Sequence, residues 1–343
     1  MITASGIKRQ PDEAIRTWQQ ELAEGFRRPE ELLRYLGLSD ADLPLSAAAM
    51  RDFPMRVPRS FAARMQPGKA DDPLLRQVLP LAAESETRDG FVMDPVGDMA
   101  SRQADGLLKK YRGRALLITT GACAIHCRYC FRRHFPYNEQ NAGRLSWQPA
   151  LEAVAADPDI NEIILSGGDP LSLADQKLQP LMEGLGSIAH IHRLRVHTRL
   201  PVVLPSRVTD KLVGMLRAFP GPVTVVLHVN HSREIDEEVV AAVQRLQETG
   251  ALLLNQAVLL KGVNDSVKAL SGLSEKLTAM AVSPYYLHQL DPVAGAAHFE
   301  VNDDRAVALM EAMRERLPGY MLPRLVREIP EDLAKRPVVS TGK

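Results

Sequence analysis

The stretch "RALLITTGACAIHCRYC", Arg114–Cys130, places a predicted strand directly before a loop rich in cysteine. Its first seven residues, Arg114–Thr120, carry the branched apolar side chains of a buried β-strand. The loop then holds Cys123, Cys127 and Cys130, and the 343-residue chain has no other cysteine. An odd number of clustered thiols argues against a disulfide framework and indicates a metal or redox site in a reducing compartment.

The same texture, a short apolar run followed by a longer amphipathic stretch, continues after this loop. Further strands are predicted at 161–167, 192–198, 222–230, 251–258 and 284–290, and helices at 147–157, 175–188, 209–219, 234–250 and 266–280. Alternating strands and helices predict an α/β fold with a parallel sheet, and six such units favour a barrel or an open part of one. No G-x-G-x-x-G motif follows the first strand, so dinucleotide binding is not indicated.

Three segments are predicted along the chain. Residues 1–95 form a helical and loop-rich extension, residues 96–300 form the strand–helix body, and residues 301–343 hold a last helix followed by an irregular tail. Polar residues gather where the predicted strands end, namely at the cysteines, Ser166–Asp169, His228–His231, Asn255–Gln256 and Asp291. Barrel enzymes place their chemistry at these carboxyl ends.

The composition argues against several partners. Lys plus Arg and Asp plus Glu both number 42, so no net field attracts nucleic acid or an anionic membrane. No apolar run approaches the roughly 18 residues of a membrane span, and the N-terminus lacks an apolar signal region. The expected location is the cytoplasm.

The cysteine spacing, C-x3-C-x2-C, leaves three interpretations open. The thiols are incidental core residues, or they bind a structural zinc with His126 or His134, or they hold an iron–sulfur cluster. A 4Fe–4S cluster normally takes four cysteines, so three would leave one iron open to a ligand. With the aromatic Tyr129 before the last cysteine, the motif resembles that of radical S-adenosylmethionine (SAM) enzymes, in which the open iron binds SAM.

The resemblance extends over most of the chain. The stretches "CRYCFRRHFPY", "LSGGDPL", "LHVNHSREI", "LLNQAVLLKGVND" and "YYLHQLDPVAGAAHF" are similar to those of lysine 2,3-aminomutases, and closest to the branch that serves β-lysylation of elongation factor P. The resemblance implies a partial (β/α)6 TIM-like barrel with a C-terminal segment that binds pyridoxal phosphate (PLP). It also implies that an amino group moves from the α to the β carbon of L-lysine, giving (R)-β-lysine.

Cofactor residues follow from that resemblance. Cys123, Cys127 and Cys130 would hold the cluster, and the strand end formed by Ser166, Gly167, Gly168 and Asp169 would line the amino group of SAM. Lys335, separated by one residue from a proline, matches the lysine that attaches PLP, although "PEDLA" replaces the family's glycine-rich run before it. Arg114 and Gln256 match positions near the PLP phosphate, and Tyr111 lies close to Arg114 in sequence. Asn230 ends a predicted strand that faces the same mouth, and a satisfied polar core residue is the alternative for it.

Substrate residues follow in the same way. Arg132, two residues after Cys130, matches the arginine that takes the lysine carboxylate, a task suited to a bidentate guanidinium. Asp291 matches one of two aspartates that take the ε-ammonium, and Glu328 stands at the second position with a longer arm. A pair of carboxylates favours a basic side chain over glutamate.

Other functions stay open at this stage. They are a free-lysine or glutamate 2,3-aminomutase of general metabolism, a radical enzyme without PLP, and a zinc-stabilised binding protein without catalysis. The short stretch after Lys335 and the presence of Glu328 favour the elongation factor P branch. The expected partners are L-lysine, a reductant such as flavodoxin or ferredoxin, elongation factor P and its lysyl ligase, and a homo-oligomer is also open.

Overall fold

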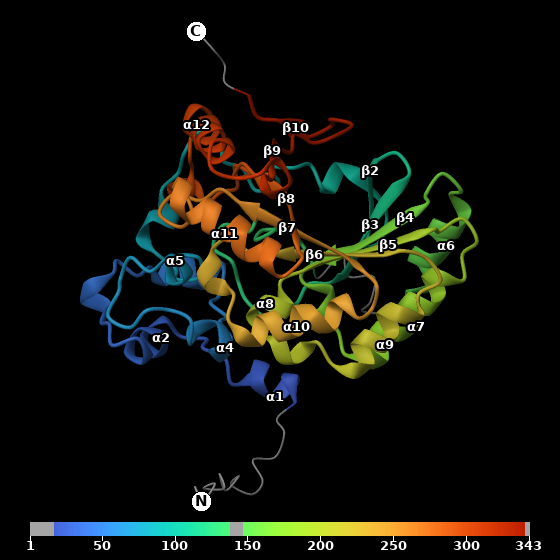
Figure 1. Ribbon diagram of the computed structural model, residues 1–343, viewed down its shortest axis with the longest axis horizontal. Coiled ribbons are helices and arrows are strands. Elements are labelled where there is room, and N and C mark those ends of the chain that lie inside the picture. The colour runs from blue at the N-terminus through green and yellow to red at the C-terminus, as the bar shows by residue number, and fades with distance from the viewer. Residues whose placement is uncertain (1–16, 138–146, 340–343) are drawn as a thin grey trace, which may run out of the picture.

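The chain has an α/β fold built on one central sheet. The structure is a computed structural model that describes residues 17–137 and 147–339. Ten strands of this described part lie side by side in chain order (Figure 1). They are β1 (Arg102–Ala104), β2 (Leu107–Tyr111), β3 (Arg114–Thr120), β4 (Glu162–Gly167), β5 (Arg193–Thr198), β6 (Val223–His228), β7 (Leu252–Val258), β8 (Ser283–His288), β9 (Arg324–Arg327) and β10 (Arg336–Pro337).

The strands from β3 to β9 run parallel, each beside the next. The predicted strands coincide with β3 to β8 apart from small differences at their ends, because their apolar and branched residues form short runs that are easy to identify. In β4, the run "EIILS" is buried throughout, whereas β7 alternates buried and less buried residues. The prediction of an α/β fold with a parallel sheet is therefore confirmed.

Helices join the parallel strands, and α7, α9 and α10 lie along one side of the sheet (Figure 1). The bounds after β3 are α6 (Gln148–Ala156), α7 (Asp175–Gly186), α8 (Leu200–Val203), α9 (Asp210–Ala218), α10 (Glu237–Gln247), α11 (Val267–Ala279) and α12 (Asp303–Arg314). Several begin at a side chain that accepts a hydrogen bond from the first turn, as Thr209 does for α9 and Asp236 for α10. These caps fix the helix starts close to where the sequence predicts them.

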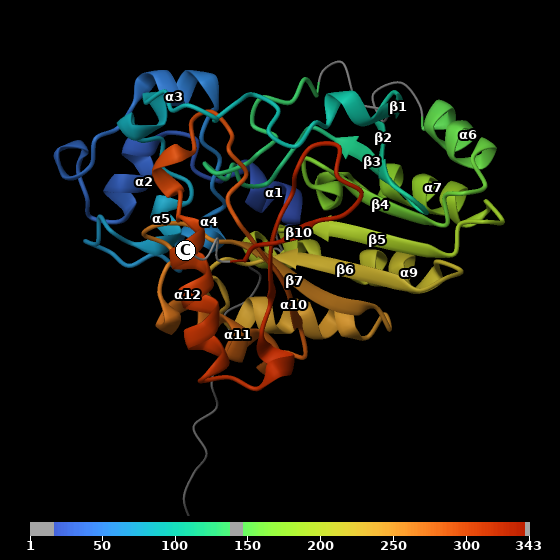
Figure 2. The same cartoon turned by 90° about the horizontal axis from the view of Figure 1, so that it is seen from above.

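Both ends of the sheet contain strands that the sequence did not reveal. β1 and β2 form an antiparallel ribbon before β3, and β10 pairs antiparallel with β9. The tail after α12, predicted as irregular, thus continues the sheet. In two views at right angles, β10 crosses the side of the sheet that faces away from α9 and α10 (Figures 1 and 2).

The N-terminal part consists of short helices, α1 (Trp18–Ala23), α2 (Pro29–Tyr35), α3 (Ala47–Asp52), α4 (Arg59–Ala62) and α5 (Pro73–Arg76). Its buried side chains, among them Trp18, Phe61 and Leu74, belong to the same apolar core as the strands and the later helices. The extension therefore shares one hydrophobic core with the body that follows it.

Candidate active site

A cavity of about 380 Å³ opens on the inner face of the sheet. It is bounded by β2 to β8, by the cysteine loop and by the tail after β9, and its size is typical of a small-molecule site. All predicted site residues except Asn230 line it, although they are far apart in sequence. They are Tyr111, Arg114, Cys123, Cys127, Cys130, Arg132, Ser166, Gly167, Gly168, Asp169, Gln256, Asp291, Glu328 and Lys335.

The N-terminal extension holds the backbone of the cysteine loop. The Arg56 guanidinium donates to the carbonyl of Cys123 at 3.1 Å, and the His126 amide donates to the carbonyl of Arg56 at 3.0 Å. The amide of Arg128 donates to the carbonyl of Gln77 at 2.9 Å. The extension thus has a structural task at the site, which the sequence did not reveal.

A buried carboxylate from the same extension neutralises two arginines of the loop. Glu84 accepts from Arg128 Nε at 2.8 Å and from Arg133 Nη2 at 2.7 Å. Arg128 also donates to the carbonyls of Phe53 and Ala49. Charges taken out of water need pairing of this kind, so Glu84 is an anchor for the cysteine loop.

Glu84→Gln is expected to lower the free energy of unfolding by about 3–5 kcal/mol, because it leaves two buried guanidinium groups without their carboxylate. Denaturant titration of the purified protein measures this loss. Glu31→Gln is the matched control, because Glu31 pairs with Arg28 at the surface, where the expected loss is below about 1 kcal/mol. Equal losses in the two variants would contradict the assignment of Glu84 as an anchor.

The three thiols are free and face the cavity. Burial, with the neighbouring thiols as a further cause, raises the pKa of Cys123 well above its usual value and that of Cys130 to about 11. Such thiols ionise when a metal centre takes them as ligands. Within the described residues, no three His, Cys, Asp or Glu side chains converge to hold a single metal ion. A cluster needs no such convergence, because each thiolate holds its own iron.

The turn after β4, "SGGDP", packs against the entry to the cysteine loop. Gly167 has a φ of +109°, and a Cβ there would lie 2.8 Å from the Thr120 carbonyl oxygen. A Cβ on Gly168 would lie 2.4 Å from the carbonyl oxygen of Ala122. The two glycines therefore allow the backbone after β4 to approach the backbone after β3 closely, which brings the two strand ends together at the cavity.

Asp169 is buried beneath this turn. Its carboxylate accepts from the Thr198 hydroxyl at 2.7 Å and from the backbone amides of Leu171, Arg199 and Leu200. These four bonds fill the acceptor sites of a carboxylate. Asp169 therefore joins the ends of β4 and β5, and no acceptor site is left for the ammonium group that was predicted to bind it.

Ser166, at the end of β4, also lines the cavity and remains a candidate ligand-binding residue. The Ser166 hydroxyl accepts from Arg132 Nη1 at 3.2 Å, so this strand end is tied directly to the predicted carboxylate-binding arginine. Elsewhere in the cavity lining, the Arg114 guanidinium lies 4.5 Å from the centre of the Tyr111 ring. Gln256 reaches the cavity from β7. Arg114 and Gln256 offer donors suited to a phosphate.

Asn230 does not line the cavity and is fully buried. Its amide nitrogen donates to Tyr129 at 2.6 Å and to Gln77 at 3.0 Å, and its amide oxygen accepts from the backbone of Val258 at 2.8 Å. The prediction that Asn230 binds the phosphate of a cofactor is corrected accordingly. Its polar groups are used inside the protein, as expected for a satisfied core residue.

A chain of charged groups runs through the cavity from Arg132 to Lys335. Arg132 Nε lies 2.6 Å from Asp98 Oδ2, and Lys110 Nζ lies 2.6 Å from Asp98 Oδ1. Lys110 also contacts Glu328 Oε1 at 2.9 Å, and Glu328 Oε2 pairs with Lys335. The ammonium groups of Lys335 and Lys110 hold the pKa of Glu328 at about 2, despite its burial. Glu328 is therefore an ionised carboxylate that binds ammonium groups.

Asp291 lies in the same cavity, after β8, without such a direct partner among the described residues. Burial, and next the charge of Glu328, raises the pKa of Asp291 to about 7, although Lys335 and Lys110 act in the opposite direction. An isolated buried carboxylate is costly, and an incoming cation would relieve that cost.

Several cavity residues were missed from the sequence. Asp98 and Lys110 complete the charged chain, and His197 and His288 line the cavity from β5 and β8. Burial lowers the pKa of both histidines, to about 3 for His288, so both are neutral. The alternation of inward residues along each strand would have indicated the histidines. Asp98 lies in a loop, where no such period exists.

Comparisons with known proteins identify close relatives. No protein-family model matches the chain. It is 47% identical to the L-lysine 2,3-aminomutase of Escherichia coli (strain K12), over 94% of each chain. It is 43% identical to that of Haemophilus influenzae, over 91% of this chain and 92% of the relative. The L-lysine 2,3-aminomutase of Clostridium subterminale is 32% identical, over 94% of this chain and 77% of the relative.

Among solved structures, a radical SAM methyltransferase from Sphaerobacter thermophilus superimposes with a TM-score of 0.46 at 19% identity. The match covers 64% of this chain and 68% of that one. A search of the described helices found none that combines the length and the apolar character needed to cross a membrane.

Proposed function

This chain belongs to the lysine 2,3-aminomutase family, and we propose that it converts L-α-lysine to (R)-β-lysine by moving the amino group from the α to the β carbon. The protein is thus an isomerase. Enzymes of this family use a 4Fe–4S cluster, SAM and PLP. We further propose that the curved parallel sheet is the partial (β/α)6 barrel of the radical SAM type, with the tail after α12 as its PLP-binding segment.

The cavity residues suit these three groups. Cys123, Cys127 and Cys130 would hold the cluster, the end of β4 at Ser166–Gly168 would face SAM, and Lys335 would attach PLP through its Nζ. Tyr111, Arg114 and Gln256 would hold the PLP phosphate. When bound, the cluster with SAM supplies a radical that removes hydrogen from lysine, and PLP supplies the carbonyl on which the amino group migrates.

The protein's own residues would bind and orient the substrate. Arg132 would bind the lysine carboxylate beside the cluster loop, and Asp98 holds that guanidinium in place. Glu328 and Asp291 would bind the ε-ammonium. Positioning of this kind is the main contribution of a protein to chemistry that its cofactors perform.

The pairing of Glu328 with Lys335 is the observation that best supports lysine as the substrate. The Glu328 carboxylate already binds a primary ammonium inside the cavity. If Lys335 is used to attach a cofactor, one oxygen of Glu328 becomes available to the ε-ammonium of a substrate, while Lys110 still holds the other. Glutamate would place a carboxylate against Glu328 and Asp291, so the glutamate alternative is disfavoured.

The value of kcat/KM for lysine is expected to rise with pH and to level off above about pH 7. Asp291 is neutral below its pKa of about 7 and ionised above it, and only the ionised form pairs with an ammonium. Because kcat/KM reports on the free enzyme, its pH profile shows this ionisation. The rising limb is expected to disappear from the residual activity of Asp291→Asn. A profile that is flat near neutrality in the unaltered protein would contradict this role.

The destination of the product is a further part of the proposal. We propose that (R)-β-lysine is passed to the lysyl ligase of elongation factor P, with flavodoxin or ferredoxin as electron donor. The support is the similarity of "CRYCFRRHFPY" and of Glu328 to that branch of the family. In a reconstituted mixture with the ligase and elongation factor P, a mass increase of one lysyl residue on the factor should require this protein. An equal mass increase with α-lysine and no aminomutase would count against this destination.

An anaerobic assay tests the activity itself. Protein with a reconstituted cluster is incubated with reductant, SAM, PLP and L-lysine, and β-lysine is separated by chiral chromatography. A matched reaction receives L-glutamate instead. Formation of (R)-β-lysine with no β-glutamate is the expected result. Rearrangement of glutamate without rearrangement of lysine would overturn the substrate assignment. Zinc in place of iron and sulfide in the purified protein would instead favour a binding protein without catalysis.

A further inference from the structure

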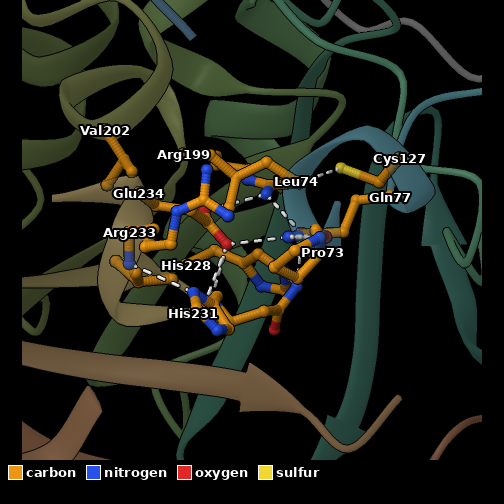
Figure 3. A network of polar contacts seen from close by, with 12 residues as sticks. Pro73, Leu74, Gln77, Cys127, Arg199, Val202, His228, His231, Arg233 and Glu234 are labelled. Atoms are coloured by element: carbon orange, nitrogen blue, oxygen red, sulfur yellow. Dashed lines mark hydrogen bonds and ion pairs between the residues drawn. The ribbon is translucent and has the colours of Figure 1, made fainter. Parts of the chain in front are cut away.

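Arg199, which follows β5, contacts a cysteine of the candidate cluster site directly. Its Nη1 donates to Cys127 Sγ at 2.7 Å and to the Tyr129 hydroxyl at 2.7 Å. Figure 3 shows its guanidinium between Cys127 on one side and Glu234 on the other. Among the arginine side chains in the described part of the chain, that of Arg199 is the one with a hydrogen bond to a cysteine sulfur.

The guanidinium has little freedom to leave this position. Nη2 donates to Glu234 Oε2 at 2.9 Å and to Gln77 Oε1 at 2.7 Å, and the Arg199 side chain is 6% exposed. Its backbone amide is held by Asp169 at 2.7 Å. An arginine fixed at both ends keeps its charge beside the sulfur, because any movement would break buried polar contacts.

Glu234 is fixed in turn. It is fully buried, and its Oε1 accepts from Gln77 Nε2 at 3.0 Å and from the backbone amides of Asn230 and His231. The pair formed by Arg199 and Glu234 therefore acts as an oriented dipole whose positive end points at Cys127. Only that end touches the cluster site.

A positively charged hydrogen-bond donor beside a thiolate ligand stabilises the reduced cluster, which carries more negative charge than the oxidised cluster. A 4Fe–4S cluster gains one negative charge when it accepts an electron, and hydrogen bonds to its sulfurs are among the features that set its reduction potential. In a site shielded from water this effect is stronger than at the surface. The cluster must accept such an electron from its donor before SAM can be cleaved.

We propose that Arg199 raises the reduction potential of the cluster by its charged hydrogen bond to Cys127, with Glu234 limiting the effect. This inference rests on the proposed cluster but not on the substrate. Arg199 is accordingly a positioning and tuning residue rather than a catalytic one. It makes one-electron transfer from a low-potential donor more favourable.

The test is a reductive titration of the reconstituted cluster, followed by electron paramagnetic resonance in the absence of lysine. Iron and sulfide are measured on the same samples. Arg199→Gln is expected to shift the midpoint to a more negative value by about 59 mV or more, which is a tenfold change in a one-electron equilibrium. Arg199→Lys keeps a positive charge near the sulfur and is expected to lie between Arg199→Gln and the unaltered protein.

Two further variants separate tuning from a structural role. Arg207→Gln removes an equally buried arginine that pairs with Asp175 and has no bond to a cysteine, so its midpoint should not move. Glu234→Gln removes the compensating charge, so its midpoint should become less negative. A fully loaded Arg199→Gln cluster with an unchanged midpoint would overturn the proposal. If Arg199→Gln does not hold a cluster, an unchanged or more negative midpoint in Glu234→Gln overturns it.

These outcomes differ from failure of the proposed function. If the protein makes β-lysine but Arg199→Gln leaves the midpoint potential of the cluster unchanged, the proposed function stands and the tuning role of Arg199 is wrong. If Arg199→Gln shifts the midpoint potential as expected but the unaltered protein makes no β-lysine, the tuning role stands and the substrate assignment is wrong.

Discussion

Lys335→Ala is expected to purify without PLP and to lose lysine aminomutase activity by on the order of 10⁴-fold or more. Attachment of the cofactor through Lys335 would hold it in the cavity, and effective concentrations of groups held in this way reach about 10⁵ M or higher. The variant should still fold, because Glu328 keeps its contact with Lys110 when Lys335 is removed. Absorbance of bound PLP and thermal unfolding measure the two properties separately.

Two variants and one mapping experiment make the role of Lys335 specific. Lys335→Arg keeps a cation beside Glu328 but cannot attach PLP, so it should be as inactive as Lys335→Ala. Lys109→Ala removes a lysine of β2 that pairs with Asp157 and does not line the cavity, so this variant should keep its PLP. Borohydride reduction of the loaded protein should label the peptide that contains Lys335. Label on another lysine, or on none, would show that the residue has been assigned wrongly.

The parallel strands and the cluster loop were predictable because each is specified locally. The run "RALLITT" carries the branched apolar residues of a buried strand and forms β3, and C-x3-C-x2-C places its three predicted ligands within one loop. Helix caps such as Asp236 are equally local. Features of this kind depend on periods and spacings that a sequence displays directly.

The rest of the site depends on contacts between distant segments. Asp98 and Lys110 occupy a loop and an antiparallel strand without a motif, yet they connect Arg132 to Glu328. Glu84 and Gln77 come from the extension, which gave no chemical signal of its own. Gly167 and Gly168, predicted to line the amino group of SAM, also lie close against carbonyl oxygens of the chain's own backbone. Long-range pairing of this kind is set by the tertiary structure, which no single period in the sequence encodes.

Arg132 combines both kinds of information. The sequence places it beside the cluster loop, and the structure shows its Nε bound to Asp98 and its Nη1 bound to the Ser166 hydroxyl. Asp98 is fully buried, and its partners Arg132 and Lys110 hold the pKa of Asp98 below its usual value despite that burial. The aspartate therefore stays ionised and fixes the plane of the guanidinium, which leaves the outer edge of the fork for a carboxylate.

Arg132→Lys is expected to reduce kcat/KM for lysine by roughly 30- to 5,000-fold. The estimate corresponds to the loss of about 2–5 kcal/mol when one member of a buried charged pair is truncated, at about 1.4 kcal/mol per tenfold change. Lysine at this position keeps the positive charge and can still reach Asp98, so the folded state should survive, but it cannot form two parallel bonds to a carboxylate. Steady-state kinetics of β-lysine formation should show most of the loss in KM for lysine, with PLP and iron content unchanged.

Arg133→Lys is the matched control, because Arg133 bonds to Glu84 and lies outside the cavity lining. This variant should alter stability while KM for lysine stays the same. An unchanged KM in Arg132→Lys would mean that another group binds the substrate carboxylate.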